Sequence, residues 1–574
     1  MRKTTVLLAG LALFSLGCDG GESDENAKVD TVADVEAEPI AEEDAAAPAS
    51  EAPLFVEVLE ASLSAPIPAQ IVFGRLKGEG LGTEVVLEGM LRETSTFVDV
   101  DESPEELYPF QVVLLTGADE VLWRDSIREP VQVREFLGNA GLQEMGIDPI
   151  NILPEVGDFV FPMPDLDEAE TLRIERIELD GEATILGTFP LADIPEMPEY
   201  EFADAPVTKI VGNAPPEEAL DVVILGDGYT EDELGLFKTH AGKISTAFTQ
   251  VQPYSEYFKR LNFYRVDIPS QESGASYDCS DTEEIEGCVD NFRETAFGSV
   301  FPLRLGVLLG MEVSDRAIFQ LKQWSVYQAA SLAPFDTVVI LVNTKKYGAF
   351  GIYNASLSAY LDNLGRVTVH EMGHSFSLLG DEYVVEGDIC QAYLLTPDYP
   401  NLSPLGTTPS DVKWVDWLTW NVPLPTPSDD AAWSDAVGLF AGAGAGCVDY
   451  YRPKADCLMR STSSGAPLCP VCKEQTIHRF YETFDYLSAD GVRADGETLV
   501  LAHDYGAPAT GEWRVNGELA GDAMVPLAFE RPAPGTSEEY QVKLVVRDGT
   551  EGVRRGTDTL EETVEATVRV TAPE

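Results

Sequence analysis

Two histidines and a glutamate stand close together in the segment His370-Glu371-Met372-Gly373-His374. Residues i and i+4 lie one above the other on the same face of an α-helix, so two imidazoles at this spacing can hold one ion. Apolar residues on both sides of the segment favour a buried helix, and the whole chain has only five histidines. The pattern therefore predicts a helix that presents His370 and His374 to a single Zn²⁺.

Glu371 lies one residue further round the same helix, which puts its carboxylate beside the metal rather than on it. A zinc ion lowers the pKa of a water molecule that it binds, and a neighbouring carboxylate can then remove the proton. We therefore expect one catalytic Zn²⁺ as cofactor and Glu371 as the general base of a hydrolytic reaction.

A catalytic zinc site needs a third protein ligand and an open coordination position. Gly380 is expected to end the helix region in the left-handed conformation and to turn the following Asp381-Glu382 back towards the histidines. Asp381 comes first and has the shorter side chain, so it is the predicted ligand. Glu382 reaches further and stays the alternative, in which case Asp381 would orient a histidine through its second ring nitrogen.

The first eighteen residues predict export from the cytoplasm. Basic Arg2-Lys3 precede a short apolar run, and Gly17 then precedes Cys18 as in a bacterial lipoprotein signal. We expect Cys18 to carry a lipid, the only predicted contact with a membrane, and the catalytic domain to lie in the periplasm or at the cell surface. An ordinary secretory signal with a chance cysteine is the alternative.

Seven cysteines follow Cys18. In an exported protein cysteines are expected to form disulfides, and an odd number leaves at least one without a partner in its own chain. Cys279 and Cys288 bracket a short acidic loop and are the first predicted pair. Cys469 and Cys472 form a CxxC, for which structural disulfides are favoured over a second zinc site or a redox motif. The disulfide candidates are Cys279, Cys288, Cys390, Cys447, Cys457, Cys469 and Cys472.

The length of 574 residues predicts several domains, because single cores rarely grow beyond about 300 residues. After the signal peptide, residues 1–18, the acidic residues 19–53 lack aromatic side chains and are expected to form a disordered tether. Short apolar runs and turns in residues 54–200 indicate a β-rich accessory domain. Residues 205–487 are expected to form an α/β (α+β) zinc peptidase domain, and residues 488–574 a small Ig- or PKD-like β-sandwich.

Within residues 205–487, local patterns predict particular elements. Residues 221–225 and 337–342 are expected to be buried strands. Thr230 and Glu233 have the spacing of a capping box at the start of a helix. Residues 347–351 are predicted either to be a sheet edge that aligns an extended substrate or to be a surface loop.

The charge of the chain excludes one class of partner. There are 99 acidic and 38 basic residues, and the formal net charge is -61. Such a surface repels a phosphate backbone, so no nucleic-acid partner is expected. The charge is expected to serve solubility rather than the recognition of a cationic substrate.

Several segments resemble peptidase family M64, the IgA-peptidase-like metallopeptidases. The segments similar to family blocks are residues 221–230, 262–267, 341–348, 369–376 with 380–383, 451–453, 457–460 and 469–472. The resemblance covers about residues 205–485. It implies a metzincin-like zinc peptidase fold, in which Met459 forms the Met-turn beneath the metal.

The predicted function is that of a secreted, lipid-anchored zinc metalloendopeptidase acting on protein or peptide substrates. Two alternatives stay open. One is a surface adhesin with a structural zinc, against which Glu371 argues because a structural site needs no general base. The other is a zinc-dependent amidase acting on cell-wall peptides. No oligomeric state is predicted.

Overall fold

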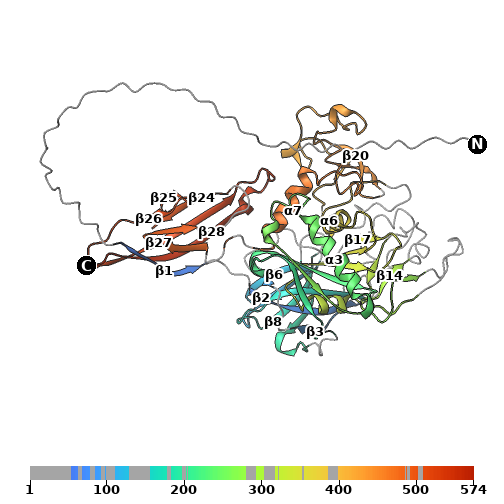
Figure 1. Cartoon of the computed structure of the whole chain (residues 1–574), viewed down its shortest axis with the longest axis horizontal. Helices are drawn as coiled ribbons and strands as arrows, with labels where there is room; N and C mark the ends of the chain where they lie inside the picture. The colour runs from blue at the N-terminus through green and yellow to red at the C-terminus, as the bar shows by residue number, and fades with distance from the viewer. Residues whose placement is uncertain are drawn as a thin grey trace, which may run out of the picture. The chain divides into compact units, whose positions relative to one another are not determined.

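The computed structural model describes most of the chain from residue 53 onwards (Figure 1). The described residues are 53–62, 67–77, 84–91, 97–98, 110–127, 156–177, 183–196, 202, 204–278, 292–302, 317–320, 322–351, 354–384, 399–445, 447–484, 487, 491–501 and 509–574. The predictions for Cys18, the tether up to residue 52, and Cys279, Cys288 and Cys390 therefore lie outside the described residues.

The described chain is rich in β-structure, as predicted, with several separate sheets. Its α-helices, within the described residues, are α3 (Leu234–Phe248), α5 (Gln323–Ala330), α6 (Leu364–Ser375) and α7 (Pro470–Tyr481). None of the described helices is long and apolar enough to cross a membrane. The metzincin-like fold and the β-sandwich stay predictions.

Two four-stranded sheets follow one another in the N-terminal part. In the first, β2 pairs with β3, β4 and β7, and the second has the order β6-β5-β8-β9. The strands are β2 (Ile67–Lys77), β3 (Glu84–Leu91), β4 (Phe97–Val98), β5 (Phe110–Leu115), β6 (Val121–Ile127), β7 (Val156–Pro164), β8 (Thr171–Ile177) and β9 (Ala183–Pro190). Val72 of β2 and Val112 of β5 share one hydrophobic cluster, so the two sheets have a common core.

A mixed six-stranded sheet forms the centre of the region that contains the histidine motif. Its strands are β10 (Val207–Val211), β11 (Leu220–Asp227), β12 (Leu261–Val266), β16 (Thr337–Val342), β17 (Ala349–Gly351) and β18 (Ala355–Ser358). In the order β10-β12-β11-β16-β18-β17, the four inner strands are parallel and both edge strands are antiparallel. β11 and β16 are buried along their whole length, which confirms the two predicted buried strands.

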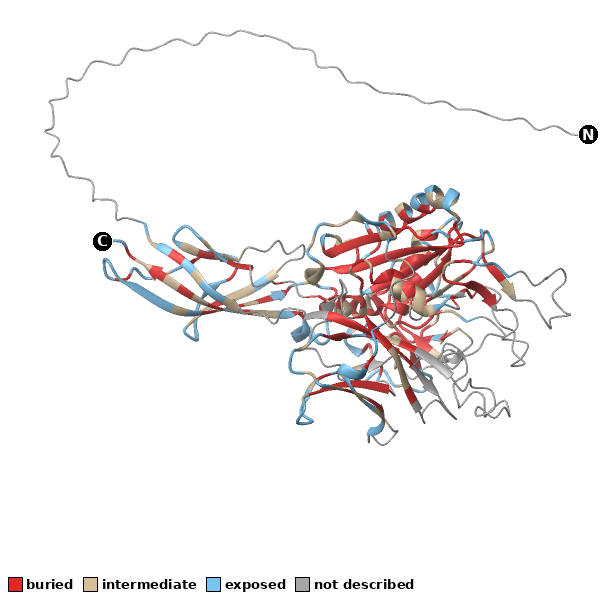
Figure 2. Cartoon of the chain, turned by 90° about the horizontal axis from the view of Figure 1, so that it is seen from below, coloured by how far each residue is buried: buried red, intermediate tan, exposed pale blue. Residues whose placement is uncertain are grey.

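Successive residues of β11 pack into different clusters, as expected for a strand covered on both faces. Val222 and Ile224 share a cluster with Met372 of α6, and α3 contributes to the same cluster. Val223 and Leu225 belong to a second cluster with Val326 of α5, which also includes residues of β2. Figure 2 shows buried residues along these strands and the adjoining helices. One face of the sheet therefore packs against α6 and supports it.

The predicted capping box is confirmed at the start of α3. The backbone N–H of Thr230 donates to Oε2 of Glu233 at 3.0 Å, and the side chain of Thr230 caps the backbone of Glu233. The first turn is a 3₁₀ helix, η5 (Glu231–Glu233), and the α-helix begins at Leu234. Gly228, just before the cap, has φ +71° and lies so close to Gly274 that a Cβ would be 1.8 Å from its carbonyl oxygen. Only glycine fits this turn.

The C-terminal part contains a five-stranded sheet with the order β1-β28-β27-β24-β25 and a three-stranded sheet with the order β22-β23-β26. The strands are β22 (Val492–Asp495), β23 (Thr498–Leu501), β24 (Ala509–Val515), β25 (Glu518–Asp522), β26 (Leu527–Ala528), β27 (Ser537–Asp548), β28 (Glu561–Thr571) and β1 (Phe55–Ser62). Trp513 and Leu499 come from different sheets but share one core cluster. Asn516 and Gly517, both with positive φ, form the turn between β24 and β25.

One strand differs from the predicted domain boundaries. β1 lies in the segment expected to begin the accessory domain at residue 54, yet it pairs antiparallel with β28 of the C-terminal sheet, from Phe55 opposite Thr571 to Ser62 opposite Glu565. Figure 1 shows the two strands side by side. An alternating pattern indicates that one face of a strand is buried, but it carries no information on which sheet buries it.

Two three-stranded sheets complete the described strands. The strands are β13 (Ser276–Asp278), β14 (Ser299–Pro302) and β15 (Phe319–Gln320) in one sheet, and β19 (Ser403–Pro404), β21 (Cys447–Arg452) and β20 (Phe440–Ala443) in the other. The C-terminal sheet contacts the central region through Asp548, which accepts hydrogen bonds from the hydroxyls of Tyr257 and Tyr481 at 2.6 and 2.8 Å.

Candidate metal centre

The predicted helix is present as α6, and it brings His370 and His374 together on one face. Their ring centroids are 4.8 Å apart and their Nε2 atoms are 3.3 Å apart. Val369 and Met372 fix the helix against the sheet because both are fully buried in the cluster beneath it. The spacing of four residues therefore gives the side-chain arrangement expected from the sequence.

Backbone carbonyl groups fix the orientation of both imidazoles. Nδ1 of His370 lies 3.1 Å from the carbonyl oxygen of Leu458, and Nδ1 of His374 lies 2.7 Å from that of Leu379. A carbonyl oxygen only accepts hydrogen bonds, so each Nδ1 carries a proton, and Nε2 is the nitrogen of each ring that can bind a metal. Sequence reasoning missed these two contacts, because a backbone carbonyl leaves no trace in the identity of its residue.

Asp381 completes the group. Its Oδ1 lies 3.2 Å from Nε2 of His370 and 3.2 Å from Nε2 of His374. Glu382, the alternative from the sequence, is fully buried with its Oε1 3.1 Å from Sγ of Cys472. Of the two candidate carboxylates, the structure therefore brings Asp381, and not Glu382, to the histidines.

The turn that precedes Asp381 has a different backbone conformation from the one predicted. The left-handed residue is Leu378, with φ 56°, and Gly380 does not have a positive φ. Glycine is needed at 380 for packing, because a Cβ there would be 2.5 Å from Cδ1 of Leu402. The backbone N–H of Gly380 donates to Oδ1 of Asn401, whose Nδ2 donates back to the carbonyl of Gly380. Asn401 was missed because it lies twenty-one residues further along the chain.

Met459 packs against α6 beneath the histidines. A Cβ built on Gly373 would be 2.5 Å from Sδ of Met459, so the thioether occupies the space that this glycine leaves open. The backbone of Met459 also accepts a hydrogen bond from the N–H of Glu382 at 2.9 Å. The residue that the family resemblance assigned to a Met-turn thus touches both the histidine helix and the segment that carries Asp381.

The three polar atoms have the spacing of metal ligands. Nε2 of His370, Nε2 of His374 and Oδ1 of Asp381 form a triangle with sides of 3.2, 3.2 and 3.3 Å. Ligands about 2.0–2.1 Å from a tetrahedral ion are roughly 3.3–3.4 Å apart. With Nδ1 protonated and the rings neutral, as metal binding requires, the facing atoms are all lone-pair donors, and a cation between them satisfies all three. The residues therefore fit Zn²⁺.

The electrostatics of the centre favour positive charge. Burial disfavours the charged imidazole of His374, but the carboxylates of Asp381 and Glu371 outweigh it and raise its pKa to about 9. Burial also disfavours ionised Asp381, yet the two histidines hold its pKa well below the usual range. For Glu371, burial raises the pKa of the carboxyl group above its ordinary value. Glu371 is therefore a stronger base than an exposed glutamate, as its predicted role requires.

Edge strand β17 lies directly against the glutamate of the motif. A Cβ on Gly351 would be 2.2 Å from the carbonyl oxygen of Glu371, so the two backbones are in close contact. β17 is the last strand in the order of the six-stranded sheet, and it is antiparallel to β18. Within the predicted segment 347–351, residues 349–351 thus form a sheet edge that contacts the helix of the candidate centre, and residues 347–348 lie outside the strand.

Three of the predicted disulfide cysteines are free thiols in the structure. Cys457, Cys469 and Cys472 are fully or almost fully buried and unpaired, so the preference for disulfides among them is wrong. They gather around Glu382 instead. The side chain of Cys447 lies outside the described residues, like those of Cys279, Cys288 and Cys390. The physical reason for the correction is that three sulfur atoms and a carboxylate meet at one point, rather than two sulfur atoms meeting as a pair.

Part of the chain, including the candidate metal centre, matches a known protein family. Residues 208–436 match the family model described as IgA Peptidase M64. The matched range includes the histidine motif, Asp381 and Glu382, and it ends before Met459 and the three clustered cysteines. No curated protein matches the chain.

Proposed function

The chain carries, over residues 208–436, a peptidase domain of the IgA Peptidase M64 family, and on that premise we propose that it is a zinc metalloendopeptidase. The observation that carries the proposal is the triangle formed by His370, His374 and Asp381, with Glu371 on the next position of the same helix. This is the donor set of a catalytic zinc site with three protein ligands and a fourth position for the reaction.

In the proposed mechanism, His370, His374 and Asp381 hold the ion. When bound, Zn²⁺ polarises the scissile carbonyl and lowers the pKa of a water molecule. Glu371 removes the proton of the attacking water and delivers it to the nitrogen of the leaving amine. Burial supports the first of these steps, because it raises the affinity of the Glu371 carboxylate for the proton of the water.

The substrate is proposed to be an extended polypeptide that lies along β17. A peptide can add to a sheet edge through main-chain hydrogen bonds, which depend little on its sequence. The close contact between Gly351 and Glu371 puts this edge next to the general base. An edge strand that runs past the centre favours cleavage within a chain, so we propose endopeptidase activity.

We also propose that the enzyme is exported and held at the bacterial cell envelope by a lipid on Cys18. The support is the sequence of the first eighteen residues alone. The acidic residues 19–53 would then separate the lipid from the catalytic region, which would act on protein or peptide substrates in the periplasm or at the cell surface.

The decisive experiment is a digest of a peptide library by the full chain, with and without a chelator. We expect cleavage at internal peptide bonds, its loss with chelator and its recovery when Zn²⁺ is restored. Peptidoglycan and an unfolded protein are incubated in parallel. Release of cell-wall peptides without cleavage of the library would favour the amidase, and no hydrolysis of any substrate by the zinc-loaded protein would favour the adhesin.

A further inference from the structure

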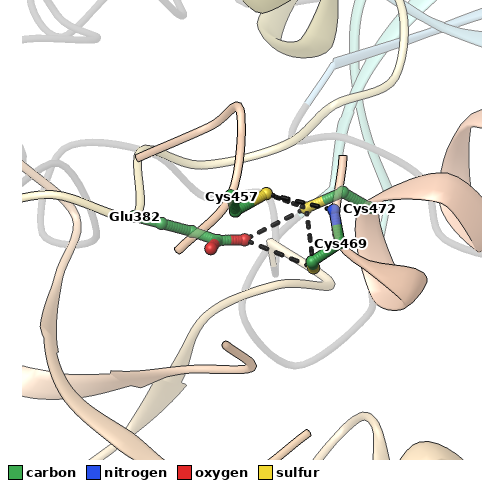
Figure 3. Close-up of side chains that lie close together, drawn as sticks. All are labelled: Glu382, Cys457, Cys469 and Cys472. Atoms are coloured by element: carbon green, nitrogen blue, oxygen red, sulfur yellow. Dashed lines mark hydrogen bonds between the residues drawn. The ribbon is translucent and has the colours of Figure 1, made fainter. Parts of the chain in front are cut away.

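A second group of metal-binding side chains lies outside the histidine centre. It consists of Glu382, Cys457, Cys469 and Cys472, whose ligand atoms all lie within 4.8 Å of one another (Figure 3). Glu382, Cys457 and Cys472 are completely buried, and Cys469 is 2% exposed. The four residues come from three segments: the turn after α6, the segment before Met459, and the first turn of α7.

The distances between these atoms match the ligands of one ion. Sγ of Cys472 lies 3.5 Å from Sγ of Cys469 and 3.9 Å from Sγ of Cys457. Oε1 of Glu382 lies 3.1 and 3.7 Å from Sγ of Cys472 and Cys469. A tetrahedral zinc with Zn–S of about 2.3 Å and Zn–O of about 2.1 Å has S···S edges of roughly 3.8 Å and S···O edges of roughly 3.6 Å.

The environment of Glu382 points to a cation at the same place. Its Oε1 accepts a hydrogen bond from Nδ2 of Asn401 at 3.1 Å. Its Oε2 is buried and accepts no hydrogen bond from the residues that the structure describes. A buried carboxylate is costly unless it is paired or coordinates a metal.

Helix α7 favours the thiolate form of Cys469. This residue is the N-cap of the helix, where the partial positive charge of the helix N-terminus stabilises anions. Metal binding requires thiolates. Sulfur-rich tetrahedral sites select Zn²⁺ among the common divalent ions, and oxygen-preferring Mg²⁺ and Ca²⁺ do not suit them.

We propose that Glu382, Cys457, Cys469 and Cys472 hold a second, structural Zn²⁺. Four protein ligands in a buried position leave no open coordination site, so this ion does not take part in hydrolysis. This ion would connect the chain segments that position the metal ligands of the first centre. Glu382 directly follows Asp381, and Cys457 directly precedes Leu458, whose carbonyl fixes His370. The second ion therefore holds the catalytic ligands in position.

The first test counts zinc in the purified full chain by elemental analysis. We expect two ions per wild-type chain, one in His374→Ala and one in the double variant Cys469→Ala/Cys472→Ala. The two variants are matched controls for each other, because each removes ligands of one centre only. One ion in the wild type, or two in the double cysteine variant, would overturn the proposal.

The second test identifies the ligands and does not depend on folding of the cysteine variant. Wild type and His374→Ala are prepared with Co²⁺ in place of zinc, and the near-ultraviolet absorption is recorded. A thiolate-to-cobalt charge-transfer band is expected in both, because only the second centre contains sulfur. Absence of the band in wild type, or a disulfide between any two of the three cysteines found by mass spectrometry, would rule the second centre out.

The two tests also separate this proposal from the proposed function. A protein with two ions and a thiolate–cobalt band that cleaves no peptide would keep the second centre and remove the peptidase assignment. An active peptidase with one ion and no such band would do the opposite.

Discussion

At the scale of single residues, the orientation of the two histidines depends on atoms that the motif does not include. The carbonyl groups of Leu458 and Leu379 accept from both Nδ1 atoms, and this orients both rings so that Nε2 faces Asp381. Outer contacts of this kind set the tautomer and raise the basicity of a ligand. Leu458 comes from a segment eighty-eight residues beyond His370, so it contributes to the centre only in the folded chain.

Replacing the general base separates binding of the metal from catalysis. Glu371→Gln keeps all three proposed ligands and a side chain of similar size, but it cannot accept the proton. We expect unchanged zinc content by elemental analysis and a fall in turnover of at least about 100-fold, the lower end for loss of a general base. Cleavage close to the wild-type rate by the zinc-loaded variant would contradict the mechanism.

The neighbouring carboxylates Asp381 and Glu382 are expected to serve different ions. Asp381→Asn removes a proposed ligand of the first centre, so we expect its zinc affinity to fall by more than about 10-fold, the lower end of the range for outer contacts. Glu382→Gln is expected to weaken only the second ion. Competition with graded chelator measures both losses in each variant, and loss of the catalytic ion in Glu382→Gln alone would reverse the assignment.

At the scale of elements, the contact between β17 and α6 couples the sheet edge to the catalytic helix. Gly351 allows the strand to approach the backbone of Glu371 without a side chain in between. β17 is at the edge of the sheet because it pairs only with β18, which lies between β17 and β16 in the strand order of the described residues. A side chain added at Gly351 must move the strand or the helix, because the atom that it would meet is the backbone carbonyl oxygen of Glu371 and cannot rotate away.

A methyl group at this contact is expected to disturb catalysis more than binding of the metal. In Gly351→Ala the added Cβ would be 2.2 Å from the carbonyl oxygen of Glu371, so β17 and α6 must separate. We expect retained zinc and at least a 10-fold fall in kcat/KM, roughly the effect of 1.4 kcal/mol on a barrier.

Gly521→Ala is the matched control for this variant. Gly521 also lies in a strand, β25, but its Cβ would meet nothing within 4 Å. Its activity should equal that of the wild type. Equal activity of Gly351→Ala and Gly521→Ala would show that the close contact has no catalytic importance.

The elements were predicted to different extents by the sequence, for identifiable reasons. Buried strands β11 and β16, the capping box before α3 and the helix of the histidine motif follow local rules, and all were predicted. The sheet to which β1 belongs, the conformation of Gly380 and the grouping of Glu382 with Cys457 depend on contacts distant in sequence. A pattern of residues can indicate burial or a ligand type, but not which distant segment supplies the partner.

At the scale of the whole molecule, the excess of acidic groups includes a carboxyl group that is buried in the central sheet. Asp221 at the start of β11 lies beside Asp336, whose Oδ2 accepts a hydrogen bond from the backbone N–H of Asp221 at 2.6 Å. Asp221 is buried, whereas Asp336 is exposed, and burial raises the pKa of Asp221 to about 7. The Asp221 carboxyl group is therefore most easily accommodated in the fold when it is protonated.

The buried carboxyl group of Asp221 predicts how stability depends on pH. The folded protein holds the proton of Asp221 more tightly than the unfolded chain, so its contribution is complete below about pH 4 and is lost as pH rises towards 7. Asp221→Asn removes that titration while its side-chain oxygen can still accept from Asn262. Urea unfolding should show the variant gaining stability relative to wild type between pH 5 and pH 8. A difference that is the same at both pH values would contradict this account.

The attachment of the whole chain to a membrane is tested by removing the proposed lipid site. Cys18→Ala should release the protein into the soluble fraction without changing its activity, because residues 19–53 separate Cys18 from the catalytic region in sequence. Fractionation of cells that express each form measures the outcome. If the variant is cleaved after its signal and still sediments with membranes, the lipoprotein prediction is wrong.

The pairing of β1 with β28 has a consequence for the order in which the protein can be completed on the ribosome. β1 ends at Ser62 and β28 begins at Glu561, so about 500 residues are translated between the two partners. Until the last strand emerges, β1 has no neighbour in its sheet, and closing so long a loop is entropically unfavourable and slow. An incomplete chain that ends anywhere before β28 therefore has an unpaired β1, whereas in the complete chain β1 is paired. Chaperones and proteases that recognise unpaired strands can use this difference to remove incomplete copies.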